Sequence, residues 1–129
     1  MSSHYLKCVV KGSFENVFEV LSKAFGNVYA KKFGESREPS KGIILGEEYF
    51  FRVNSDVAVL IILEERSVEE TEIEIISCAG GAGLARVSYS AHSAYTHKVK
   101  DFLIDSGFKV DVKEEIPYFT GFSYRLRTM

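Results

Sequence analysis

The sequence predicts an α+β domain in which a curved antiparallel sheet of about five to seven strands packs two α-helices on one face, in the order β-α-β-β-β-β-α-β. Three patterns predict it. Residues 57–63 are seven consecutive apolar residues, typical of a strand buried on both faces. Residues 71–76 alternate apolar and polar side chains, as in a strand with one wet face. Residues 14–25 repeat apolar side chains at helical spacing, so they predict an amphipathic helix.

The first two predicted elements are a strand and a helix. Residues 5–11 alternate, and Gly12 and Ser13 end the strand. Ser13 is a suitable N-cap, and Gly26 stands where a C-terminal cap belongs. The buried face of the helix is expected to consist of Phe14, Val17, Phe18, Leu21 and Phe25.

Four strands are expected next. They cover residues 27–33, 43–53, 57–63 and 71–79. Residues 34–42 form a polar loop between the first two, and short turns join the last three into an antiparallel meander. The alternation separates residues expected to face the helices from residues expected to face away. The first group is Leu6, Cys8, Val10, Ile73 and Ile75, and the second is Lys7, Lys11, Glu72 and Glu74.

The last third of the chain begins with the glycine-rich residues 80–83. We expect a short strand over 84–90, a second helix starting near Ser90 or Ser93, and a strand over 108–112. All 129 residues are expected to form one domain, with a flexible start over 1–4 and a C-terminal arm or edge strand over 115–129.

Residues 75–81 (Ile-Ile-Ser-Cys-Ala-Gly-Gly), the Ser88-Tyr89-Ser90 segment and the helix ending in Phe102-Leu103 resemble small uncharacterised prokaryotic domains built as strand, helix, meander and helix. The order of elements over residues 5–107 also resembles TATA-binding-protein-like and helix-grip sheets in outline. The resemblance implies an antiparallel sheet with two helices and brings no function with it.

Composition narrows the class of protein. The formal net charge is −2, which argues against an electrostatic partner such as nucleic acid or an anionic membrane. No apolar stretch reaches the roughly 20 residues of a spanning helix, so we expect a cytoplasmic protein. Glutamine is absent and asparagine rare, as in thermophile proteins. Cys8 and Cys78 are expected to be reduced and buried, with a bridge between them as the alternative.

The reactive and polar side chains of the sequence do not form a recognisable catalytic motif. The glycines at 80–83 lack the following Lys-Ser or Lys-Thr pair of a phosphate loop, so a structural turn and a binding loop both stay open. His92 and His97 are five positions apart, which puts their rings on different sides of a helix, and we predict no metal site. Cys78 and His92 meeting as nucleophile and base is a further alternative. No catalytic residue and no cofactor are predicted.

The apolar strand needs a cover on its outer side, which is either the tail over residues 118–126 or a second copy of the protein. The leading prediction is a non-enzymatic module that associates with itself as a dimer. The expected interface residues are Val57, Val59, Ile61, Tyr118, Phe122 and Tyr124. The alternative is a small apolar or anionic ligand, or a modest hydrolytic activity, between the second helix and the sheet. Its expected residues are Gly80, Gly81, Arg86, Ser90, His92 and Tyr95. A third hypothesis is single-stranded nucleic-acid binding through the aromatic tail with Arg125 and Arg127.

Overall fold

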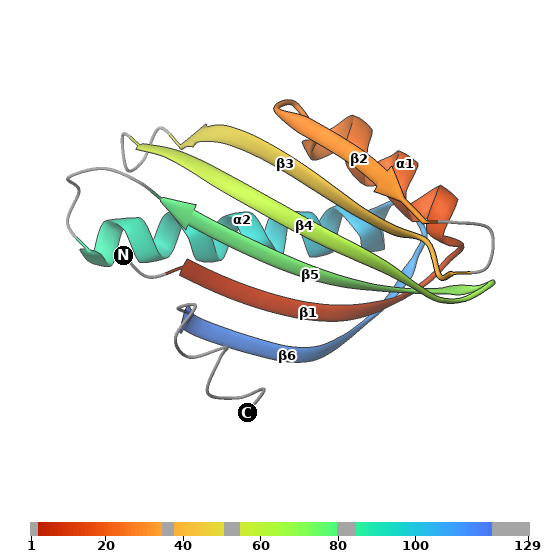
Figure 1. Ribbon diagram of the computed structural model, residues 1–129. Coiled ribbons are helices and arrows are strands. Elements are labelled where there is room, and N and C mark those ends of the chain that lie inside the picture. The colour runs from red at the N-terminus through yellow and green to blue at the C-terminus, as the bar shows by residue number, and fades with distance from the viewer. Residues whose placement is uncertain (1–2, 35–37, 51–54, 80–84, 120–129) are drawn as a thin grey trace.

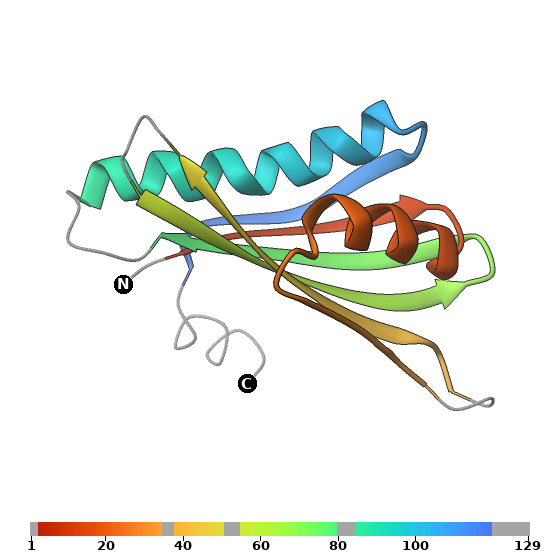
Figure 2. The same ribbon diagram turned by 90° about the horizontal axis from the view of Figure 1, so that it is seen from above.

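The computed structural model describes residues 3–34, 38–50, 55–79 and 85–119. Its elements are β1 (Ser3–Lys11), α1 (Phe14–Phe25), β2 (Tyr29–Phe33), β3 (Lys41–Phe50), β4 (Ser55–Ser67), β5 (Glu70–Ala79), α2 (Ala85–Asp105) and β6 (Lys109–Phe119). All neighbouring strands pair antiparallel in the order β2-β3-β4-β5-β1-β6. Figure 1 shows the curved sheet, and Figure 2 shows both helices on one of its faces. The predicted fold class and element order are confirmed.

Helix α1 forms where the sequence predicts it because its ends and its apolar face are both specified locally. The Ser13 hydroxyl accepts a hydrogen bond from the Asn16 amide at 3.2 Å, and the Gly26 amide donates to the Ser22 carbonyl at 2.9 Å. All five residues predicted for its apolar face are buried.

The core lies between the sheet and the two helices. Strand register places Ile44, Ile61, Ile75 and Leu6 side by side across β3, β4, β5 and β1, and all four are fully buried. Helix α2 packs on β1, β4 and β5 with Tyr95, Val99 and Leu103, while α1 covers the β3 and β4 side. The residues predicted to face the helices do so: Leu6, Cys8, Val10, Ile73 and Ile75 are fully buried.

Three boundary predictions are wrong. Residues 85–90 belong to α2 and not to a strand; β-formers two residues apart, Val87 and Tyr89, gave the strand signal, but the helix continues through them. The strand predicted to end at residue 112 continues to Phe119 as β6, so residues 115–119 belong to the edge-strand alternative of the predicted C-terminal arm; charged residues and a proline are tolerated on an edge strand. Ser3 and His4 are part of β1 and not of a flexible start, and His4 is buried.

Over the part of the chain that the structure describes, no helix has both the length and the apolar character required to cross a membrane.

Candidate functional site

The outer face of the sheet is the face away from both helices. On β4, Val57, Val59 and Ile61 are fully buried in the core, whereas Ala58, Leu60 and Ile62 alternate with them and are half-buried. The prediction that Val57, Val59 and Ile61 form an interface is therefore wrong. Because β4 is apolar on both sides, its sequence does not indicate which alternate residues point toward the core. The pairing with β5 fixes their direction, since Ile61 lies opposite the inward-facing Ile75.

Pairing across the strands joins the outward residues of β4 to apolar neighbours. Leu60 lies between Leu45 and Ile76, and Ile62 lies opposite Ile43. All of these side chains are half-buried. We call this surface the outer apolar patch; it consists of Ile43, Leu45, Ala58, Leu60, Ile62 and Ile76.

A charged surface of mixed sign borders the outer apolar patch. The Lys7 ammonium lies 3.5 Å from the Glu72 carboxylate, which also pairs with the Arg66 guanidinium. The Tyr5 hydroxyl donates a hydrogen bond of 2.7 Å to Glu74. The charges of this border largely neutralise one another, so it does not attract a partner of one strong sign.

The other predicted interface residues are only partly covered by the structure. Phe122 and Tyr124 lie outside the described residues, as do Arg125 and Arg127 of the nucleic-acid hypothesis. Tyr118 lies in β6, but its side chain is outside what the structure describes.

A pocket of about 350 Å³ lies between the end of α1, strand β3 and helix α2. It contains one of the six residues predicted to bind a ligand, the buried Tyr95. Gly80 and Gly81 lie outside the described residues. Arg86, Ser90 and His92 belong to α2, with side chains outside what the structure describes.

Aromatic rings and one ion pair define this pocket. The ring of Phe25 meets that of Phe102 edge to face at 5.4 Å and lies 6.1 Å from Tyr95. The Lys98 ammonium pairs with the Glu48 carboxylate among the lining residues. Burial, followed by the nearby Glu48 and Glu47 carboxylates, raises the pKa of Tyr95 to about 12, so its hydroxyl stays protonated.

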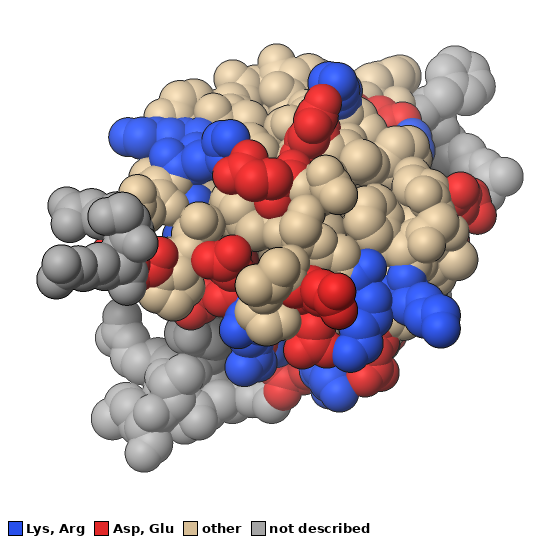
Figure 3. Space-filling view, turned by 90° about the vertical axis from the view of Figure 1, so that its right-hand side faces the viewer, with Lys and Arg blue, Asp and Glu red and all other residues tan. Residues whose placement is uncertain are grey.

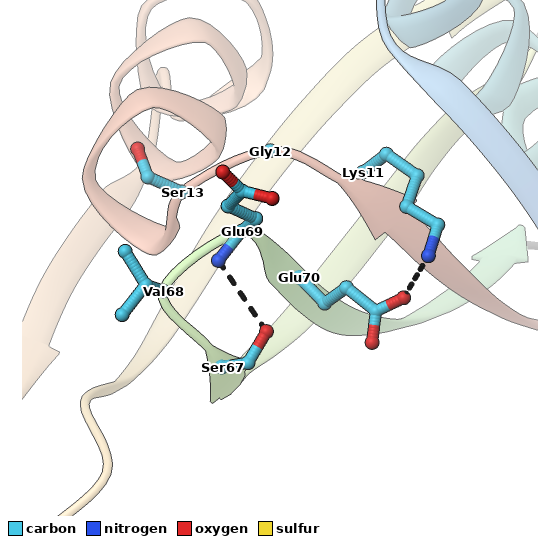
Figure 4. A pocket seen from close by; sticks show the side chains of 7 residues that line it. All are labelled: Lys11, Gly12, Ser13, Ser67, Val68, Glu69 and Glu70. Carbon is cyan, nitrogen blue, oxygen red and sulfur yellow. Dashed lines mark hydrogen bonds and ion pairs between the residues drawn. The ribbon is translucent and has the colours of Figure 1, made fainter.

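A more open hollow of about 610 Å³ lies at the β4–β5 turn, beside the start of α1. Lys11 is paired with Glu70, as Figure 4 shows. The Glu69 amide donates a hydrogen bond of 3.3 Å to the Ser67 hydroxyl. The hydrogen bond between Lys11 and Glu70 raises the pKa of Lys11 and lowers the pKa of Glu70, so both side chains remain charged. On this side of the molecule acidic and basic residues are interspersed, as Figure 3 shows. The hollow therefore presents no concentrated charge to a ligand.

The structure brings together three polar residues that the sequence pattern did not connect. Nε2 of His4 and Nε2 of His97 lie 2.7 and 2.9 Å from the same oxygen, Oε2 of Glu115. Strand β1 supplies His4, α2 supplies His97 and β6 supplies Glu115. We call this group the His–Glu–His cluster. Helical spacing relates His97 only to His92, which lies on the same element. The inward direction of His4, shared with Leu6 and Cys8, is the signal that could have found it.

The cluster lies at the margin of the core. His4 is 1% exposed, while His97 and Glu115 are each over a third exposed, at 37% and 38%. Partial burial acts to raise the pKa of Glu115, but the hydrogen bonds with His97 and His4 outweigh it and lower the pKa overall. Glu115 is therefore a carboxylate at neutral pH, and two imidazoles can approach it.

The two cysteines point to opposite faces of the sheet. Cys8 is buried among the core residues, whereas Cys78 lies opposite Ala58 on the outer side, and both are free. A bridge between them is therefore excluded in this fold. Helix α2 packs on the inner face, so Cys78 is also turned away from the helix that contains His92. Burial raises the pKa of both thiols, that of Cys8 to about 12.

Alkylation should distinguish Cys8 in the folded and unfolded protein. With a pKa of about 12, roughly one Cys8 in ten thousand is a thiolate at pH 8, whereas unfolding restores the ordinary cysteine pKa. We expect iodoacetamide to leave Cys8 unmodified in buffer and to modify it completely in guanidinium chloride, as read by peptide mass spectrometry. Rapid modification of Cys8 under native conditions would contradict this buried position.

No model of a protein family matches this sequence, and no curated protein is similar enough to it to count as a relative.

Proposed function

We propose that this protein is a non-enzymatic binding module that associates with a second copy of itself through the outer apolar patch. One observation carries the proposal: six apolar side chains from three adjacent central strands lie next to one another on the face that neither helix covers. An apolar surface at the centre of a sheet is typical of a protein interface.

A second copy is the occupant that the charges of the surface favour. A two-fold interface brings the same patch from each copy together, so the patch must complement itself. The patch meets that condition. Its centre is apolar, and the bordering Glu72 is paired with Lys7 and Arg66, so neither the centre nor the border strongly repels the same surface on a second copy. The net charge of −2 adds little repulsion between two copies.

The sheet edges are less suited to this association than its face. The edge strand β2 contains adjacent Lys31 and Lys32, both exposed, and β6 contains charged residues and Pro117. Lysine and proline on an edge oppose pairing with another strand. Two copies would therefore pack sheet on sheet, about 10 Å apart, as the layers of a β-sandwich do.

The variant Leu60→Glu tests the proposal directly. A carboxylate at the centre of the patch must be buried without a partner in a dimer but remains hydrated in a monomer. We expect at least a tenfold weaker dimer with the same circular dichroism spectrum, measured by sedimentation equilibrium.

Val68→Glu is the matched control, because Val68 is 82% exposed in the β4–β5 turn and lies away from the patch. It should dimerise like the wild type. If Leu60→Glu and Val68→Glu have equal dimer affinities, the outer apolar patch is not the interface.

The pocket beside Tyr95 supports a second candidate function, the binding of a small apolar ligand. Three aromatic rings in its lining suit the apolar part of such a molecule, and its volume of about 350 Å³ falls in the range of small-ligand sites. A ligand found by native mass spectrometry should raise the melting temperature of the wild type and fail to raise that of Phe102→Ala. An equal thermal shift in the two proteins would place the ligand elsewhere.

A further inference from the structure

We infer that the His–Glu–His cluster is a binding site for one divalent transition-metal ion of the zinc class. The inference goes beyond the proposed association, because the cluster lies between α2 and the inner side of β1 and β6, away from the outer apolar patch. Its three potential ligand atoms, two imidazole nitrogens and one carboxylate oxygen, all lie within 4.8 Å of one another.

The distances fit a shared ion. Zinc lies about 2.0–2.1 Å from imidazole nitrogen and about 2.0–2.2 Å from carboxylate oxygen, which places two ligands of one tetrahedral ion about 3.4 Å apart. The separations from Glu115 Oε2 are 2.7 Å to His4 and 2.9 Å to His97, which are hydrogen-bond distances. An ion between the three side chains replaces these hydrogen bonds and requires the carboxylate to move outward until the separations reach about 3.4 Å.

The donor set also selects the class of metal. Imidazole nitrogen favours zinc, cobalt, nickel and copper over magnesium and calcium, which prefer oxygen ligands throughout. The Glu115 carboxylate contributes a negative charge, which favours a cation beside the two neutral imidazole ligands. Three protein ligands leave at least one coordination position for water.

The surroundings hold the ligands in place at different depths. His4 is fixed in a strand paired on both sides and is 1% exposed. His97 and Glu115 are each more than a third exposed, so an ion can enter from solvent. Strand β1 is far in sequence from α2 and β6, so a bound ion would tie the start of the chain to these two later elements.

Cobalt and zinc titrations of the untagged full chain test the inference. After dialysis against a chelator, the wild type should bind one equivalent of Co²⁺ with visible absorption bands, and Zn²⁺ should displace it. The variants His97→Ala and Glu115→Gln should each bind at least tenfold more weakly. Both changes are at partly exposed positions and are expected to leave the fold intact by circular dichroism.

The third histidine supplies a matched control. The chain contains three histidines, and His92 is not among the three residues that define the cluster. His92→Ala should bind Co²⁺ as the wild type does. The inference is overturned if the wild type binds no metal at micromolar concentrations, if His97→Ala and Glu115→Gln bind as tightly as the wild type, or if His92→Ala loses the ion. In those cases the cluster is a set of hydrogen bonds that joins α2 to β1 and β6.

Discussion

Replacing Ile61 with alanine should reduce the free energy of unfolding by about 4 kcal/mol, the upper part of the range for a large-to-small change in a core. Ile61 is fully buried in β4, between Ile44 and Ile75 on the neighbouring strands. The change removes apolar contacts and leaves a cavity that the paired strands cannot close. Urea unfolding followed by circular dichroism measures the effect.

The adjacent residue provides the control for this prediction. Ile62→Ala removes the same atoms from the half-buried outer side of the same strand, so about 1 kcal/mol is expected in a dilute, monomeric sample. Equal losses for the two variants would contradict the inward direction of Ile61.

Replacing Gly46 with alanine should cost about 3 kcal/mol or more, because the new methyl group meets main chain that cannot move aside. A Cβ atom on Gly46 would lie 1.8 Å from the Phe25 carbonyl oxygen and 3.0 Å from its carbon. The segment after α1 is held there by the Asn27 side chain, which exchanges two hydrogen bonds of 2.9 Å with the main chain of Glu47. Thermal and urea unfolding should both report the loss.

Gly107→Ala is the comparison for Gly46→Ala. Gly107 has a φ of 100° but no atom within 4 Å of an added Cβ, so only backbone strain of about 1 kcal/mol opposes the change. A Gly46→Ala protein as stable as Gly107→Ala would show that β3 and the end of α1 are not in such close contact.

Local patterns were sufficient for much of the fold. Helix α1 was predicted with both of its ends, because Ser13, Gly26 and five apolar residues at helical spacing specify it within one segment. The alternation in β5 likewise predicted that Ile73 and Ile75 face the helices. These features depend on residues close in sequence.

Features that depend on distant residues were not predicted. The direction of Val57, Val59 and Ile61 is fixed only by pairing with β5, since β4 is apolar on both sides. The His–Glu–His cluster joins His4 to a residue 111 positions away. No periodicity within one element can reveal a contact of that kind.

The mass of the wild-type protein in solution tests the central claim most directly, that a second copy covers the outer apolar patch. Sedimentation equilibrium at micromolar concentrations should give twice the chain mass of 14.5 kDa, with dissociation on dilution. A single species of 14.5 kDa across that concentration range would contradict the claim.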